Sequence, residues 1–465
     1  MKLMKSLVLL GSVLALSACD SDSNNNNRNQ DAEFFSLQVL HASPDAPPVN
    51  VFVDGVEVLS GVDFKEGSAQ LGLQVRDIPY SIRVDGITPD GDVTVIGPAD
   101  FTFEADTTYT IAAINGVADI EPAIISQPDT SSAASARIFV LHGTAGPGPD
   151  FSLPVDVYVD AFSEPAAPIG TSAPFTFDFR GTIGPAELAP GDYQIRVTLA
   201  GDPDTVVYDS GRVPLAAGDD LVLAAVPNID GGPAAVSLVA LTGTGSAEFA
   251  DVNAPTGLRI GHLSPDTPEV DVVVDGEIFL GNVPFPAVTD IGALPAATYN
   301  VAVQATVNPG TFPIGPVDLD LEAGTWYTVL AVDFLANIEP LILTDDGRSV
   351  ATNAKVRIVH ASPTAQDVDI YVVAPGTDIN TVDPTLAVVP FKANTGYLAL
   401  PEGDYEVTVT PTGTKTAAIG PAAISIENGG VYTAIARDPL PGETEFGLIV
   451  LADSLIEADT RVEAD

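Results

Sequence analysis

Four histidines are the residues of this chain whose type and spacing could support chemistry, because each stands at the same place in a recurring pattern. A histidine beside a serine and an aspartate can serve as the general base of a hydrolase, and an imidazole can also bind a metal ion. The repetition therefore describes either an active site copied four times or a fold copied four times. The pattern starts at His41, His142, His262 and His360 with HASPDAPPVNVFVDG, HGTAGPGPDFSLPVDVYVDA, HLSPDTPEVDVVVDG and HASPTAQDVDIYVVAPG.

The first copy offers His41, Ser43 and Asp45 as a candidate catalytic triad. Residues this close within one turn seldom form a relay, because the base needs separate partners on its two ring nitrogens. The set is also incomplete elsewhere, since the second copy reads HGTAGPGPD and the fourth has Thr364 in place of the aspartate. We therefore predict no catalytic residue and interpret the chain as a protein that is not an enzyme.

Metal binding receives little support from the residue types. Each copy has one histidine and no cysteine, which is far short of a closed zinc site. Calcium prefers six to eight oxygen ligands, and acidic residues are abundant, but no DxDxDG loop with a following glutamate occurs. Asp156, Asp271 and Asp369 are interpreted instead as part of a solvated sheet face. We predict no metal site and no cofactor, with Ca²⁺ as the one cation left open.

The residues before each histidine indicate the side of the strand on which the ring lies. All eight residues two and four positions before the histidines are apolar, whereas three positions before lie the mostly polar Gln38, Phe139, Arg259 and Arg357. Side chains alternate across a strand, so the histidine is expected to face the core at the end of the strand. Such a ring would be buried, neutral and hydrogen-bonded to a neighbouring turn, with a lowered pKa. We therefore interpret the four histidines as structural.

The elements that position these residues read as short β-strands. The histidines are 101, 120 and 98 residues apart, a period that matches a small sandwich domain. Alternating valine-rich strands follow each histidine, Asp-Gly pairs predict tight hairpins, and a Gly-Pro step recurs in three copies. We predict four tandem antiparallel β-sandwiches, Ig-like or transthyretin-like, with about seven strands each. A tyrosine that enters a later strand is interpreted as structural in each copy, at Tyr80, Tyr193, Tyr299 and Tyr405.

The N-terminal segment MKLMKSLVLLGSVLALSAC has the charge and length of a secretory signal. Its LSAC ending resembles a bacterial lipobox, which implies cleavage before Cys19 and lipidation of its thiol. Cys19 is the sole cysteine, so no disulfide can form within one chain. The expected organisation is a signal peptide (1–18), a lipidated cysteine and disordered tether (19–33), sandwiches at 34–128, 136–243, 256–344 and 354–454, and a loose tail (455–465).

The opening pattern resembles that of the bacterial domain of unknown function 4397 family. The segments from His41 to Gly55, His262 to Gly276 and His360 to Val373 fit it best, and the second copy departs from it at GTAGPGP. The resemblance implies exported, often anchored repeat domains with no established chemistry. It carries over no functional residue.

Charge restricts the partners of the chain. The formal net charge is −45, which argues against nucleic acid and anionic lipid head groups because both would be repelled. We expect a cell-envelope protein, held through Cys19 on the periplasmic side of either membrane or at the cell surface. Its sandwiches would bind or display toward an unknown protein or polysaccharide. The alternatives are a calcium-stabilised, adhesin-like rod and an accessory module of an envelope enzyme.

Overall fold

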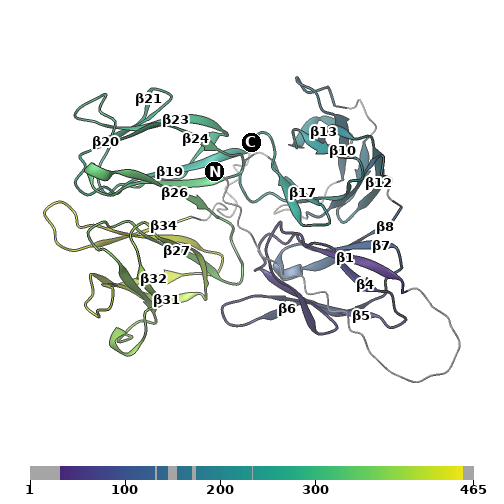
Figure 1. The fold of residues 1–465 in the computed structure, drawn as a ribbon, viewed down its shortest axis with the longest axis horizontal. Helices are drawn as coiled ribbons and strands as arrows, with labels where there is room; N and C mark the ends of the chain where they lie inside the picture. The colour runs from purple at the N-terminus through teal and green to yellow at the C-terminus, as the bar shows by residue number, and fades with distance from the viewer. Residues whose placement is uncertain (1–31, 131–132, 145–153, 170–173, 233, 454–465) are drawn as a thin grey trace, which may run out of the picture.

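A computed structural model of the chain describes residues 32–130, 133–144, 154–169, 174–232 and 234–453. The strands form four successive units of two sheets each (Figure 1), which confirms the predicted all-β tandem sandwiches. The signal peptide, Cys19, nearly all of the tether and the tail were predicted at positions that lie outside the described residues. Within those residues there is no α-helix, and the helical turns are the 3-10 segments η1 (Val117–Asp119), η2 (Leu335–Asn337) and η3 (Ile379–Thr381).

Unit one has eight strands, one more than expected, because the short β4 completes its first sheet. The two sheets have the orders β4-β1-β7-β8 and β3-β2-β5-β6. The strands are β1 (Phe34–His41), β2 (Val49–Val53), β3 (Val56–Val62), β4 (Leu71–Gln74), β5 (Tyr80–Gly86), β6 (Val93–Phe101), β7 (Thr107–Ile114) and β8 (Glu121–Pro128).

Units three and four repeat this strand order. Unit three consists of β19 (Pro255–His262), β20 (Val270–Val274), β21 (Glu277–Val283), β22 (Gly292–Pro295), β23 (Ala297–Ala305), β24 (Ile314–Leu321), β25 (Trp326–Val332) and β26 (Glu339–Asp345). Unit four consists of β27 (Ala354–His360), β28 (Val368–Val373), β29 (Leu386–Val389), β30 (Asn394–Leu400), β31 (Gly403–Pro411), β32 (Ile419–Ile426), β33 (Val431–Arg437) and β34 (Gly447–Ala452).

Unit two is larger, with two five-stranded sheets. Its last strand, β18, pairs with β17 and lies beyond residue 243, where the sequence placed the end of the second sandwich. The second sandwich therefore extends past that boundary, because residues 246–249 form an edge strand. The strands are β9 (Ala136–His142), β10 (Val155–Ala161), β11 (Phe175–Phe177), β12 (Thr182–Leu188), β13 (Gly191–Leu199), β14 (Asp202–Asp209), β15 (Val213–Leu215), β16 (Asp220–Pro227), β17 (Val236–Leu241) and β18 (Ser246–Phe249).

The histidine-bearing strand is central in one sheet of each unit. In unit one, β1 pairs antiparallel with β4 and parallel with β7, and His41 lies opposite Ala113 in the parallel ladder. The same parallel pairing joins β9 to β16, β19 to β25 and β27 to β33. We name this sheet the histidine sheet and the other the outer sheet of each unit. Apart from this one parallel contact per unit, the sheets are antiparallel.

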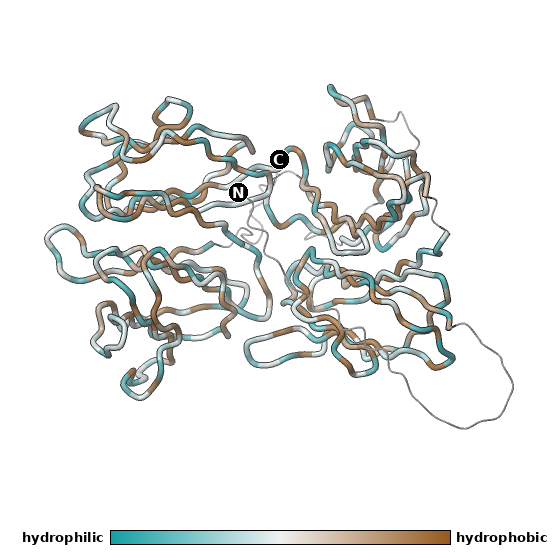
Figure 2. The backbone as a smooth tube through the Cα atoms, in the orientation of Figure 1, coloured by the Kyte–Doolittle hydropathy of each residue, from teal (hydrophilic) through white to brown (hydrophobic). Residues whose placement is uncertain are grey.

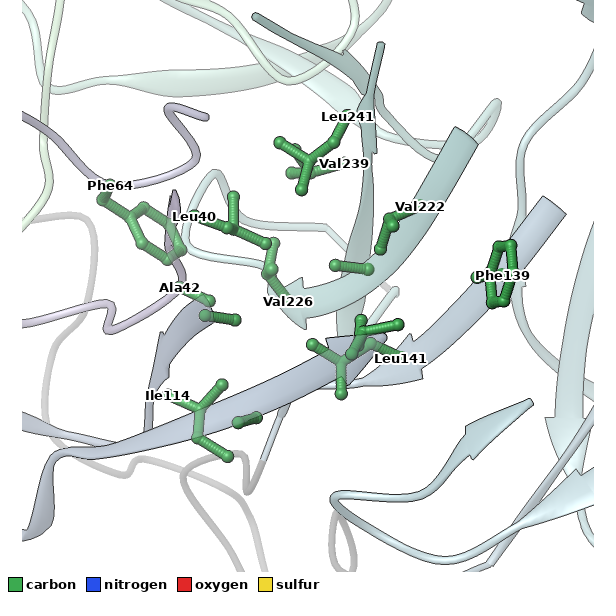
Figure 3. Packing of buried hydrophobic residues seen from close by; sticks show 14 of the residues in the cluster. Leu40, Ala42, Phe64, Ile114, Phe139, Leu141, Val222, Val226, Val239 and Leu241 are labelled. Carbon is green, nitrogen blue, oxygen red and sulfur yellow. The ribbon is translucent and has the colours of Figure 1, made fainter. Parts of the chain in front are cut away.

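The histidine sheets of units one and two pack face to face. One apolar cluster joins them, and it includes fully buried side chains: Leu40 and Ile114 of unit one, and Leu141 and Val226 of unit two (Figure 3). Apolar residues run along the histidine strands (Figure 2), and some of them pack against the neighbouring unit. The sequence predicted one wet face for each sheet, which is wrong for the histidine sheets because a neighbouring unit covers that face.

Units three and four pack in the same way. Leu263, Leu330 and Val332 of unit three contact Val359 and Ile435 of unit four in a second apolar cluster. Figure 1 shows the two pairs side by side, with β19 and β26 above β27 and β34 at the left. The four units therefore form two pairs rather than a string of separate beads.

Buried ion pairs accompany the apolar contact between units three and four. The guanidinium of Arg357 donates to Asp345 at 2.6 Å, and Arg259 is paired with Asp453. All four side chains are at most 4% exposed. Burial raises the pKa of Asp345, while the nearby charge of Arg357 opposes that shift. These charges are thus paired across the interface between units three and four.

Hydrogen bonds and an ion pair join the two pairs of units to each other. The indole N–H of Trp326 in unit three donates to the carbonyl of Asp230 in unit two at 2.7 Å. Arg348, in the segment between units three and four, donates to the carbonyl of Ala46 at 2.8 Å and pairs with Asp63, both in unit one. Trp326, which the sequence suggested to be core or edge packing, lies instead at this junction.

The repeated Gly-Pro step marks a bulge in the sixth strand of three units. Gly97, Gly315 and Gly420 have φ values of 79°, 74° and 87°, which place them in the left-handed region that favours glycine. A Cβ at Gly97 would overlap the carbonyl oxygen of Ile82 in the neighbouring strand. The recurrence of this step therefore reflects a backbone requirement.

Candidate functional site

The four repeated histidines lie at the carboxyl ends of β1, β9, β19 and β27, inside four separate sandwiches. The exposed fractions of the rings' residues are 0% for His41, 3% for His142, 1% for His262 and 1% for His360. The fold thus brings no two of them together, and each belongs to the core of its own unit.

The ring's Nε2 atom faces a backbone carbonyl six residues further along the chain. The distances are 3.1 Å from His41 to Pro47, 3.2 Å from His262 to Pro268 and 2.6 Å from His360 to Gln366. A carbonyl only accepts, so Nε2 carries the proton in these rings. In units three and four the Nδ1 atom accepts the backbone N–H of the serine two residues on, at 3.4 and 3.3 Å.

This arrangement describes a neutral imidazole that closes the turn after the strand. Burial lowers the pKa of His41, His262 and His360, because a charged ring would lose its hydration. The serine contact is made by the backbone nitrogen and not by the hydroxyl, so the ring does not activate that hydroxyl as in a hydrolase triad.

A phenylalanine packs edge-on against each histidine, and this partner was missed from the sequence. The ring centroids are 6.0–6.4 Å apart and the planes are 75–82° to one another. The signal that could have found it is a phenylalanine that follows the third strand and is usually followed by a basic residue. The four are Phe64, Phe179, Phe285 and Phe391.

The aspartate of the candidate triad binds a different turn. Asp45 accepts the backbone N–H of Val117 at 2.7 Å, and Asp266 accepts that of Leu335 at 2.7 Å. Each carboxylate thus ties the turn after the histidine to the 3-10 turn between the seventh and eighth strands.

Unit four compensates for the missing aspartate. Thr364 stands in its place, and its hydroxyl donates at 2.6 Å to Asp438, which follows the seventh strand. Asp438 also accepts the hydroxyl of Ser362. The carboxylate is therefore supplied from the opposite side of the same contact, which indicates that the repeated feature is the link between the two turns.

The repeated tyrosines make one hydrogen bond each to the turn that precedes their strand. The hydroxyl of Tyr80 donates to Gln74 at 2.6 Å. The hydroxyls of Tyr193, Tyr299 and Tyr405 donate to the carbonyl four residues before them, at 2.8, 2.8 and 3.0 Å. This is the hydrogen bond of a tyrosine corner, in which the ring fixes the entry of the chain into the strand.

The three aspartates that the sequence placed on a solvated face are buried, so that expectation was wrong. Asp156, Asp271 and Asp369 are 5–6% exposed, because their carboxylates accept backbone N–H groups from neighbouring hairpins. The hydroxyl of Thr306 donates to Asp271 and is the main cause that lowers the pKa of this carboxyl. Within the described ranges, no three His, Cys, Asp or Glu residues are grouped so that they could hold a metal ion.

Comparison with known proteins gives one family match. The family model described as "Domain of unknown function (DUF4397)" matches residues 35–150, 256–371 and 373–462. No curated protein matches the chain. A solved structure, the Bacillus anthracis TIE protein, is 10% identical with a TM-score of 0.16, over 88% of this chain and 69% of that one. In the part of the chain that the structure describes, no helix is long and apolar enough to span a membrane.

Proposed function

We propose, from the premise that this chain belongs to the DUF4397 family, that it is a non-catalytic, lipid-anchored protein of the bacterial cell envelope. Its four sandwiches would present loops and edges to a protein or polysaccharide partner, with Cys19 as the lipid attachment site. The tandem β-sandwich architecture itself is common among proteins that carry binding loops on a rigid scaffold.

The single observation that supports this proposal is the position of the repeated histidines. They are the residue type best suited to chemistry at neutral pH, yet the rings of His41, His262 and His360 are buried and each faces a carbonyl of its own turn. A ring used as a base must reach a substrate within hydrogen-bond distance. The repetition is therefore explained by the requirements of the scaffold.

The anchor is tested by cell fractionation of the Cys19→Ala variant. The wild-type chain should sediment with membranes and incorporate labelled palmitate, because several acyl chains give stable anchoring. The variant should lose the label and leave the membrane fraction. A variant that stays in the membrane fraction would refute lipid attachment at this residue.

The binding role is tested by capture from envelope and polysaccharide extracts on the immobilised chain. A protein or glycan should be retained, and its retention should not require a bound metal or turnover of a substrate. A steady release of a chemically altered glycan or peptide would contradict the non-catalytic role and favour an enzyme or an enzyme's accessory module.

A further inference from the structure

Unit two contains an apolar cavity between its two sheets. Its volume is about 210 Å³, compared with about 70 Å³ for the corresponding space in unit three and about 10 Å³ in unit one. The walls come from β9, β10, β13, β14, β16 and β17, and all the described lining residues are apolar except His142 and Thr144 at one end. The corresponding spaces in units one and three are thus smaller than the cavity of unit two.

Around the cavity, unit two is less well packed at positions that are buried in the other units. Val155, at the start of β10, is half-buried, whereas its counterparts Val49, Val270 and Val368 are 1–2% exposed. Ala225 lies opposite His142 in the parallel ladder and is half-buried. The alanines that lie opposite the other three histidines are 3–8% exposed, at Ala113, Ala331 and Ala436.

The connection that follows the strand paired in parallel with the histidine strand contributes to the difference. In the other three units this connection places a large side chain against the unit's own core: Ile120, Ile338 and Phe446. In unit two the ladder registers place Val236 at this position, because Val226 follows Ala225, the partner of His142, and pairs with Ser237. Val236 packs in the core of unit two and lines the cavity. Valine is smaller than isoleucine or phenylalanine, so the side chain at this position fills less of the core in unit two.

An apolar space of this size can hold a small apolar molecule. Its walls offer water almost no hydrogen-bond partners, and an engineered cavity of about 150 Å³ with similar walls stays dry and binds benzene. An empty space also forfeits the dispersion contacts that an occupant would restore. We propose that unit two binds a small, uncharged, apolar molecule, about the size of a single aromatic ring, inside its sandwich.

Toluene is the probe that tests this site, by hydrogen exchange of the full chain. The Cys19→Ala chain is used so that no detergent competes for toluene. Saturable slowing of exchange is expected in β10 and β13, about tenfold at a concentration about ten times the dissociation constant. Strands of units three and four should not slow. An absence of slowing, or equal slowing in all units, would overturn the proposal.

Two variants locate the effect. Ala225→Leu fills the cavity and should abolish the slowing, whereas Ala331→Leu, at the same sheet position in unit three, should leave it intact. If Ala225→Leu unfolds unit two, seen as fast exchange without toluene, the smaller Ala225→Val change should weaken binding. Slowing unchanged in Ala225→Leu or in Ala225→Val would contradict the cavity as the site. This inference does not depend on the proposed anchoring, because the probe is read without the lipid.

Discussion

Replacing Leu330 with alanine should destabilise two units at once. Leu330 is in β25 of unit three but points away from that unit's core, and it is 0% exposed because unit four covers it. The change removes three buried carbon atoms, worth about 2.4 kcal/mol at about 0.8 kcal/mol each. Incomplete collapse of the resulting cavity adds to this, and comparable replacements cost about 2.7–5.0 kcal/mol. We expect a loss of about 3 kcal/mol in the free energy of unfolding of the pair.

The assay needs one reporter in each unit. The fluorescence of Trp326, the sole tryptophan, follows unit three during urea unfolding, and hydrogen exchange of β27 and β33 follows unit four. Both should shift in Leu330→Ala. The matched control is Leu335→Ala in the same unit, where the leucine is 44% exposed and the loss should stay below about 1 kcal/mol. If exchange in unit four is unchanged in Leu330→Ala, the face-to-face pairing does not stabilise unit four and the reasoning is wrong.

Three further predictions concern charge. Arg357→Ala should cost about 3–5 kcal/mol in urea unfolding, because it leaves buried carboxylates without their partner, and a loss below about 1 kcal/mol would contradict the buried ion pair. Stability should fall as the pH drops below 6.5, because the unfolded histidines gain protons there and the buried rings, with lowered pKa values, do not. His262→Gln should reduce that slope in the melting midpoint of unit three, and an unchanged slope would show that the ring is not the titrating group. Ca²⁺ should leave the melting midpoint unchanged relative to a chelator, since the buried aspartates already accept N–H groups, and a saturable rise would favour the calcium-stabilised rod.

Local patterns in the chain were sufficient for the architecture of each unit. Strict alternation in VDVYVD and its counterparts predicted strands with one core face, and the structure has strands there. The Asp54-Gly55 and Asp275-Gly276 pairs predicted tight hairpins, and both residues of each pair have positive φ. These features depend on the steric preferences of a few adjacent residues, so each copy of the repeat specifies them locally.

The partner of each histidine required the tertiary structure. The carbonyl of Pro47 is close in sequence to His41, and a turn contact was expected there. Phe64 lies in a loop after the third strand, and Asp45 reaches a backbone N–H 72 residues away. Spacing varies between copies at these loops, so a single sequence gives no register from which such contacts can be derived.

The repeat, the strands themselves and the left-handed turns are properties that the amino-acid sequence determined by itself. The pairing of units was decided only in three dimensions. A polar residue such as Arg357 on alternate positions of a strand has the same appearance whether water or a distant carboxylate satisfies it. Arg357 meets Asp345 and Asp453 only after both units have folded, so the face that alternation marked as wet became an interface.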